Sequence, residues 1–307
     1  MKDRKVSIAI GFFQKKFGDK AALDIAKEIG TDGVDFDLLL FDYTKEESIY
    51  AKGDAAVEEY FTGIRKYAEG LGLEIAQTHG RLKGFVNIPE ADDALVENAR
   101  LDCIATRALG AKYCVMHTTT TIHMGRDAAP ELMHRLNYDM FTRILPFAKE
   151  QGIKIATETF GDATKLDCID FFGDCKEFID GYERIVSGSD CADSLCVCMD
   201  TGHTNKATRY QNNPPVGEVI RRLGSKIEVL HLNDNDTLTD QHKIPMTGTV
   251  DWEDVMNALD EIGYNGWYNL ECVLKHFGED FAIEEARFAI KVIRQILKTR
   301  YGEKQRR

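Results

Sequence analysis

The sequence lacks several features that mark common protein classes. No apolar run approaches the roughly 18 residues of a membrane-spanning helix. The short apolar run near the N-terminus has no small-residue cleavage site, so we expect neither a membrane segment nor a signal peptide. No two cysteines have the C-x-x-C spacing, and the eight cysteines are scattered, which favours buried free thiols in a reducing, cytoplasmic environment.

Basic charge is also scarce. The chain has 39 Lys and Arg against 51 Asp and Glu, so its formal net charge is −12. A negative surface repels phosphate backbones and anionic membranes, so nucleic acid is a disfavoured partner. No G-x-G-x-x-G or Walker sequence is present, which argues against a nucleotide-binding open sheet.

The chain instead alternates two hydrophobic periods, which predicts strands separated by helices. Eight short apolar runs predict strands over 6–13, 33–40, 73–79, 112–117, 153–160, 195–201, 227–232 and 266–271. Segments with apolar residues at helical spacing lie between these runs, such as the stripe of Ala22, Ile25, Ala26 and Ile29. Several of these segments end in glycine, which favours a helix C-terminus.

Eight strand–helix units predict an α/β fold of the (β/α)8 TIM barrel type. The usual barrel needs about 250 residues. The surplus falls in the strand-to-helix segments 41–53, 80–90, 118–130, 161–176, 202–215 and 233–250. No linker interrupts the pattern, so we predict one domain over 1–307. A doubly wound open sheet is the alternative fold.

Metal-binding side chains recur at the predicted strand ends. In chain order they are His79, His117, Glu158, Asp200, His231 and Glu271, and His203, Asp240 and His242 follow in the loops. Such groups are good ligands for divalent metals, and a barrel would direct all of them into one mouth. A buried carboxylate such as Glu158 needs a partner, and no Lys or Arg stands at the other strand ends.

Ordinary roles compete with metal binding at several positions. A histidine at a strand end often only hydrogen-bonds a neighbour, which leaves a structural role open for His79 and His117. For the loop residues His203, Asp240 and His242, turn formation and substrate contact are the alternatives to metal binding. Asp234 and Asp236 are typical turn formers or solvated charges. The histidines at 123, 134 and 276 lie in no motif, and we expect ordinary roles for them.

The segments CMDTGHTN, HLNDND…DQHKIPMTGTVDW and GYNGWYNLE resemble the sugar phosphate isomerase/epimerase family of xylose isomerase-like TIM barrels, whose superfamily includes endonuclease IV. The resemblance runs along the whole chain. It implies one divalent metal, with Mn²⁺ expected before Mg²⁺, Co²⁺ or Zn²⁺. The implied ligands are Glu158, Asp200, His231 and Glu271.

The leading hypothesis is therefore a metal-dependent isomerase or epimerase acting on a sugar, sugar phosphate or keto-polyol. Glu158 and Glu271 are the expected catalytic pair: one removes a proton beside a carbonyl and the other returns it through a metal-stabilised enediolate. By resemblance, His203 contacts the substrate. The same parts suit an inosose dehydratase or a C-glycoside-type lyase. The chain departs from the family where Met246 and Thr247 replace a glycine–glutamate pair.

Two further classes stay open. The strand-end and loop ligands also match the trinuclear zinc set of endonuclease IV-like enzymes, which act on abasic DNA. That match implies up to three Zn²⁺, with His79, His117, Asp240 and His242 as additional ligands. The second class is a metal-stabilised barrel that binds a sugar without converting it. By family analogy, self-association into a homo-oligomer is also expected.

Basic residues in the site-side loops bear on the choice of substrate. Arg81 and Lys83, with Phe85, form only a thin candidate for a DNA-binding loop. Lys206, Arg209 and Lys243 are candidates for holding a substrate phosphate, and solvated surface charge is the alternative for these three residues.

Overall fold

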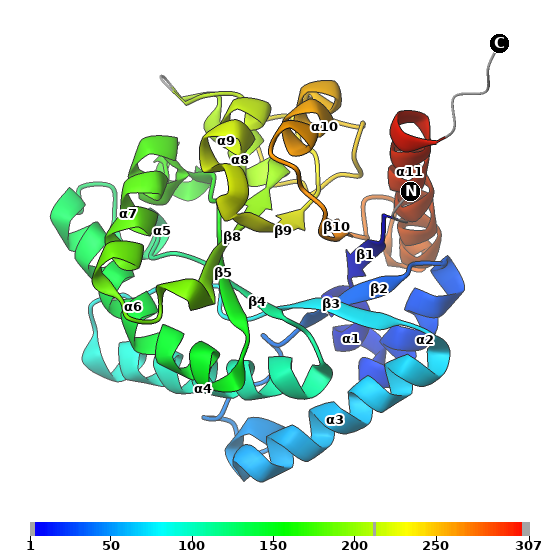
Figure 1. Cartoon of the computed structure of the whole chain (residues 1–307), viewed down its shortest axis with the longest axis horizontal. Helices are drawn as coiled ribbons and strands as arrows, with labels where there is room; N and C mark the ends of the chain where they lie inside the picture. The colour runs from blue at the N-terminus through cyan, green and yellow to red at the C-terminus, as the bar shows by residue number, and fades with distance from the viewer. Residues whose placement is uncertain (1–3, 211–212, 303–307) are drawn as a thin grey trace.

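The computed structural model describes residues 4–210 and 213–302 and shows eight parallel strands in a ring with helices around it (Figure 1). The strands are β1 (Val6–Ala9), β2 (Gly33–Asp37), β3 (Glu74–His79), β4 (Tyr113–Met116), β5 (Lys154–Glu158), β8 (Leu195–Asp200), β9 (Ile227–His231) and β10 (Tyr268–Leu270). Their order is β10-β1-β2-β3-β4-β5-β8-β9. Leu232 joins the two ends of this sheet, donating to Asn269 O at 2.8 Å and accepting from Glu271 N at 3.2 Å. The predicted (β/α)8 TIM barrel is confirmed.

Eight helices follow the predicted amphipathic segments. They are α2 (Asp19–Ile29), α3 (Asp54–Leu71), α4 (Pro89–Leu109), α6 (Pro130–Gln151), α7 (Cys175–Gly188), α9 (Val216–Leu223), α10 (Trp252–Glu261) and α11 (Ala282–Tyr301). The stripe predicted on α2 buries Ala22, Ala26 and Ile29 against the barrel. Gly30 and Gly152 end their helices in the left-handed conformation, which a residue without a Cβ adopts at low cost.

The predicted strand over 6–13 is wrong beyond Ala9. Residues Gly11–Phe17 form helix α1, which buries Phe13 and leaves Lys15 exposed. A short apolar run looks the same at the start of a strand and on one face of a helix, so periodicity alone does not separate the two.

Several of the predicted long loops also contain regular structure. The first six residues of the segment 202–215 belong to helix α8 (Thr201–Ala207), and 118–130 contains the single turn α5 (Thr121–Met124). The segment 161–176 holds a small hairpin of β6 (Asp162–Ala163) and β7 (Cys168–Ile169). Elements this short span too few residues to show a hydrophobic period.

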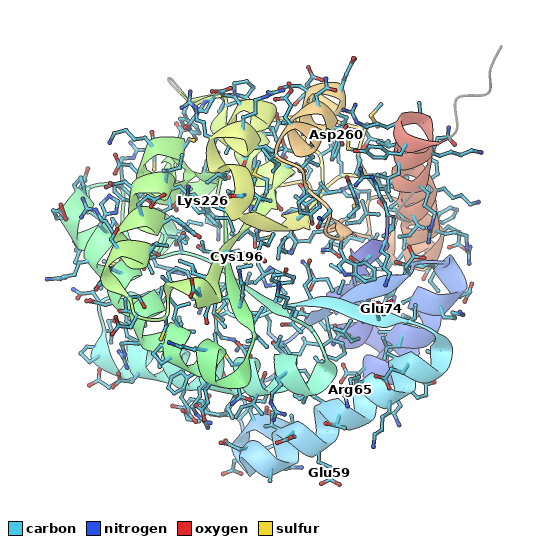
Figure 2. The ribbon with its side chains drawn as sticks, in the orientation of Figure 1. Glu59, Arg65, Glu74, Cys196, Lys226 and Asp260 are labelled. Carbon is cyan, nitrogen blue, oxygen red and sulfur yellow. The ribbon has the colours of Figure 1, made fainter. Side chains whose placement is uncertain are left out.

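Small and β-branched side chains fill the interior of the barrel. Val115, Ala156, Cys196, Cys198 and Val229 pack together there, so the two cysteines share one face as expected for a strand. Figure 2 labels Cys196 near the centre of the ring. All eight cysteines are free thiols, and six of them are buried. Among the described helices, none has the length and apolar character that crossing a membrane requires.

Candidate metal centre

The mouth at the carboxyl ends of the strands gathers every predicted ligand. Four of the ligands are the last residues of strands: His79 of β3, Glu158 of β5, Asp200 of β8 and His231 of β9. His117 directly follows β4, and Glu271 directly follows β10. His203 lies on α8, and Asp240 and His242 lie in the loop after β9. Their ligand atoms form several overlapping groups, each within 4.8 Å. Three of these groups adjoin one another: His79, His117 and Glu158; Glu158, Asp200, His231 and Glu271; His203, Asp240 and His242. Their roles as ligands stay a prediction.

Glu158 lies at the centre of these groups and is fully buried. Its Oε1 lies 3.1 Å from His203 Nδ1 and 3.3 Å from His231 Nδ1, and its Oε2 lies 3.1 Å from His117 Nε2. In the described part of the chain, neither oxygen has a hydrogen-bond partner of good geometry. Burial raises the pKa of Glu158, but the charges of His231 and His117 outweigh burial and hold this pKa well below its usual range.

Glu271 lies nearer to solvent, and its side chain is 19% exposed. Its Oε2 lies 3.2 Å from His231 Nδ1 and 3.4 Å from His242 Nδ1. Burial raises the pKa of Glu271, but His231 and His242 outweigh it and lower this pKa strongly. Glu271 lines a cavity of about 310 Å³ that opens at the mouth, together with His79 and His242.

The third group surrounds Asp240 in the loop after β9. Asp240 Oδ2 lies 3.3 Å from His242 Nε2 and 3.5 Å from His203 Nε2, and Oδ1 lies 3.7 Å from Lys206 Nζ. His242 has a φ of 44°, an uncommon conformation for a residue with a Cβ. Backbone strain of this kind is often kept at functional sites.

The charges of these groups fit divalent cations. Of the buried acids Glu158, Asp200 and Glu271, none has a Lys or Arg within 4.0 Å among the described residues. Burial lowers the pKa of His79, but Glu158 and Glu271 outweigh it and raise this pKa to about 9. Protons on histidine are thus one way to neutralise the carboxylates. Metal ions are the other, because carboxylates and imidazoles with free lone pairs are the donors that such ions prefer.

A buried network behind His231 fixes the orientation of its ring. Asp35 Oδ2 lies 3.1 Å from His231 Nε2 and accepts hydrogen bonds from Gln77 Nε2 at 2.9 Å and Asn269 Nδ2 at 3.1 Å. Asn269 Oδ1 in turn accepts from Ser7 Oγ at 2.8 Å. With Nε2–H donated to Asp35, the lone pair of His231 Nδ1 faces Glu158 and Glu271. The sequence analysis missed Asp35, although it is an acid in an apolar strand, which is the signal that identified Glu158.

Asp234 corrects one of the predictions. It is fully buried, and it accepts hydrogen bonds from Trp252 Nε1 at 2.9 Å and Val250 N at 3.0 Å. The alternative of a solvated charge is therefore wrong for Asp234. Asp236 does form a turn, as predicted, because its Oδ1 accepts from Leu238 N and Thr239 N.

Three of the basic residues in the site-side loops are held by internal ion pairs. Arg81 donates to Asp102 at 2.8 Å, and Lys206, only 3% exposed, lies 2.8 Å from Asp162 Oδ1. Arg209 contacts the other oxygen of Asp162 at 2.5 Å. The alternative of solvated surface charge is therefore wrong for Lys206, which is a buried structural cation.

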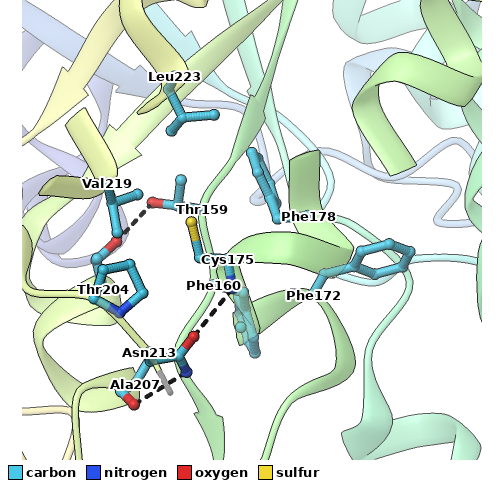
Figure 3. A pocket seen from close by; sticks show the side chains of 12 residues that line it. Thr159, Phe160, Phe172, Cys175, Phe178, Thr204, Ala207, Asn213, Val219 and Leu223 are labelled. Carbon is cyan, nitrogen blue, oxygen red and sulfur yellow. Dashed lines mark hydrogen bonds between the residues drawn. The ribbon is translucent and has the colours of Figure 1, made fainter. Parts of the chain in front are cut away.

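A small cavity of about 10 Å³ lies near the end of β5, beside α7 and α8 (Figure 3). Phe160, Phe172 and Cys175 line it, together with Thr159 and Thr204, whose hydroxyl groups are hydrogen-bonded at 3.3 Å. This volume is about that of one water molecule, so the cavity is too small for a substrate. Its walls support His203 instead, since Thr159 O lies 3.3 Å from His203 Nδ1.

Comparisons with known proteins agree with this fold. A crystal structure of a D-tagatose 3-epimerase-like protein covers 96% of this chain and 99% of its own, with a TM-score of 0.70 and 18% identity. The IOLI protein, solved with a binding zinc atom, covers 96% of this chain and 97% of its own, with a TM-score of 0.68 and 17% identity. At these identities the likeness shows the fold alone.

A curated relative points in another direction. The probable endonuclease 4 of Pediococcus pentosaceus is 29% identical over 159 residues, which are 50% of this chain and 49% of that protein. The chain thus spans about half the length of this relative. The model of the family described as "Xylose isomerase-like TIM barrel" matches residues 23–296. This chain therefore belongs to the xylose isomerase-like TIM barrel family.

Proposed function

We propose that the protein is a divalent-metal-dependent enzyme that isomerises or epimerises a carbohydrate by proton transfer between Glu158 and Glu271. One observation carries this proposal: the carboxyl groups of Glu158 and Glu271, from different parts of the barrel ring, share a cluster with Asp200 and His231, and oxygens of both lack hydrogen-bond partners among the described residues. The likeness to a D-tagatose 3-epimerase-like protein over nearly the whole chain supports a carbohydrate substrate.

The chain's own residues supply the proton transfers. A divalent cation held by Glu158, Asp200, His231 and Glu271, with Mn²⁺ as our first choice, would polarise a substrate carbonyl and acidify the neighbouring C–H. Glu271, which lines the cavity, would take that proton as a carboxylate, and the deeper Glu158, in its protonated form, would return one from another side. His203, whose Nδ1 faces Thr159 O, holds a substrate oxygen. Return to the same carbon gives epimerisation, and return to its neighbour gives isomerisation.

Proton exchange from heavy water tests this proposal directly. The metal content of the unchelated protein is measured first, with about one equivalent expected. Ketoses and inososes are then incubated in heavy water, and carbon-bound deuterium is detected by NMR. Glu158→Gln and Glu271→Gln should each slow the exchange at least 100-fold, the lower bound for a general acid or base. Glu59→Gln, on the outer helix α3, is the matched control. Full exchange in either site variant would refute the proton pair.

A trinuclear zinc phosphodiesterase is the second candidate. It is favoured by the three adjoining ligand groups and by the relative named probable endonuclease 4. This function predicts about three equivalents of zinc and cleavage of DNA at abasic sites. His79→Ala and His242→Ala should then each release one metal ion. One equivalent of metal and intact DNA would exclude it.

A further inference from the structure

We propose that the cavity at the barrel mouth selects a neutral carbohydrate over its phosphate ester, with Asp37 as a residue that binds a substrate hydroxyl group. This inference rests on the proposed function and adds the substrate class to it. The sequence left open whether the substrate is phosphorylated, and the distribution of charged groups around the cavity bears on that choice.

The cavity of about 310 Å³ joins the metal centre to solvent. Its inner end is formed by Glu271, His79 and His242, and its walls include the apolar side chains of Phe12, Leu39, Leu82, Val273 and Leu274. The charged residues on its lining outside the ligand groups and the Asp35 network are Asp37 and Lys275. A ligand that reaches the metal centre must therefore pass an apolar wall, the carboxylate of Asp37 and the exposed ammonium group of Lys275.

Asp37 ends β2 and presents a free acceptor. Its Oδ1 accepts from Leu39 N at 2.7 Å, but no hydrogen bond or ion pair to Oδ2 is found among residues 4–210 and 213–302. The neighbouring Gly11 makes room for this oxygen, because a Cβ at residue 11 would collide with Asp37 Oδ2. A carboxylate oxygen in this position accepts a hydrogen bond from a hydroxyl group and repels a phosphate.

Three of the basic side chains near the site are already held in ion pairs. Arg81 is paired with Asp102, and Lys206 and Arg209 share Asp162. Phosphate recognition normally uses several donors, often a bidentate arginine. Lys275 is the one basic side chain on the described lining; it is exposed and shares the cavity with Asp37. Even if a bound cation offset the buried carboxylates of the metal centre, the charge of Asp37 would remain.

The apolar wall suits the same class of ligand. Leu82 is 41% exposed at the rim, and Phe12 and Leu39 are half-buried beside it. A sugar ring presents C–H groups on its faces, and a glycoside adds an apolar substituent, so either covers such a wall at a gain in free energy. A strongly hydrated phosphate gains nothing there.

Binding of matched ligand pairs tests the inference. Dissociation constants of D-fructose and D-tagatose, and of their 6-phosphates, are measured by calorimetry on the full-length, metal-loaded protein. The neutral sugars should bind at least tenfold more tightly than the esters. Asp37→Asn should weaken binding of the neutral sugars. It should also reduce the ratio of the ester's dissociation constant to that of the neutral sugar by about tenfold, the effect of one charge-assisted hydrogen bond. Asp139→Asn, which removes an exposed charge on α6, should change neither value.

Three outcomes would overturn the inference. One is equal or tighter binding of the phosphate esters, above all if Lys275→Met abolishes it. Another is unchanged binding in Asp37→Asn, and the third is a panel in which no neutral sugar binds. Deuterium exchange into the same pairs separates this result from the proposed function. Deuterium exchange into a tightly bound ester would support the proton-transfer proposal and refute the preference for a neutral substrate. Tight binding of a neutral sugar without exchange would support that preference and refute the proton transfer.

Discussion

The ring of His231 is held by Asp35, which makes this acid a positioning residue for the metal centre. Asp35→Asn replaces a full acceptor by an amide that can turn its NH₂ group toward His231 Nε2. The ring is then no longer fixed with Nδ1 as the free lone pair. Loss of such a partner typically weakens metal binding about 10–100-fold. Competition with a chelating dye measures this affinity, and circular dichroism checks the fold.

Ser7→Ala is the control for the Asp35 prediction. Ser7 lies at the far end of the same network, where its hydroxyl group contacts Asn269 and not Asp35 or His231. Its loss should change metal affinity much less. Equal affinity in Asp35→Asn and the unaltered protein would show that the network does not position His231.

Asp170 gives a pH dependence that lies outside the metal centre. It is fully buried, and burial raises its pKa from 3.8 to about 7, although backbone hydrogen bonds from Thr121 and Phe172 lower it in part. Between these two values the folded state holds the proton and the unfolded state has lost it. Stability from this group is therefore full below about pH 4, falls as pH rises to about 7, and is then constant.

The variant Asp170→Asn isolates that effect. At about 1.36 kcal/mol per pKa unit, the shift corresponds to at most about 4 kcal/mol between pH 4 and pH 8. Urea unfolding across this range should show the free energy of unfolding of the unaltered protein falling relative to that of the variant. Parallel curves would contradict a raised pKa at Asp170.

Single residues also show where sequence reasoning ends. Glu158 could be predicted as a site residue because an acid in an apolar strand is costly to bury unless it is paired or binds a metal. The role of Asp234 could not, since its partners Val250 and Trp252 lie 16 and 18 residues away and meet it only in the folded loop. The local turn preference predicts a solvent-exposed Asp234, but hydrogen bonds that form only in the folded loop hold this side chain in the interior.

At the scale of elements, the loop after β9 depends on Asp234. Asp234→Ala would leave Trp252 Nε1 and Val250 N buried without this acceptor, at about 1–3 kcal/mol for each unsatisfied group. We expect a loss of about 2–6 kcal/mol in the free energy of unfolding and weaker metal binding through the displaced Asp240 and His242. Asp236→Ala, in the exposed turn of the same loop, should cost under about 1 kcal/mol.

Long elements were predictable and short ones were not. Helix α10 begins where Asp251 accepts from Asp254 N at 3.0 Å, which is an ordinary N-cap contact. Helix α8 was missed because its seven residues include His203 and the polar Thr201 and Thr204 where an apolar stripe would otherwise stand. Its N-terminal turn is fixed by Asp200, whose Oδ1 accepts from His203 N, so site geometry and not hydrophobic period defines this helix.

At the scale of the whole molecule, eight strand–helix units dictate both the barrel and the face that carries the site, because parallel strands direct their carboxyl ends to one side. That is why ligands more than 150 residues apart, such as His79 and His231, could be placed together from sequence. The substrate could not be inferred in the same way. The substrate class depends on which charged side chains of the mouth are neutralised by ion pairs. Local sequence patterns do not reveal such pairs, because partners such as Arg209 and Asp162 lie 47 positions apart.

Metal removal is the prediction that involves the whole barrel. The four proposed ligands lie at the ends of β5, β8 and β9 and directly after β10, so a cation bound only to the folded state would tie these strands together. At a free metal concentration about 1,000 times its dissociation constant, binding adds about 4.1 kcal/mol to stability. Treatment with a chelator should therefore lower the Tm by on the order of 10 °C in calorimetry. Glu271→Gln, which removes one ligand, should show a much smaller shift. If residues 1–307 form one domain, as predicted, the thermal transition should move as a single peak when the metal is removed. A second peak whose temperature does not depend on metal would contradict the one-domain prediction. An unchanged Tm after verified loss of metal would show that metal binding does not stabilise the fold.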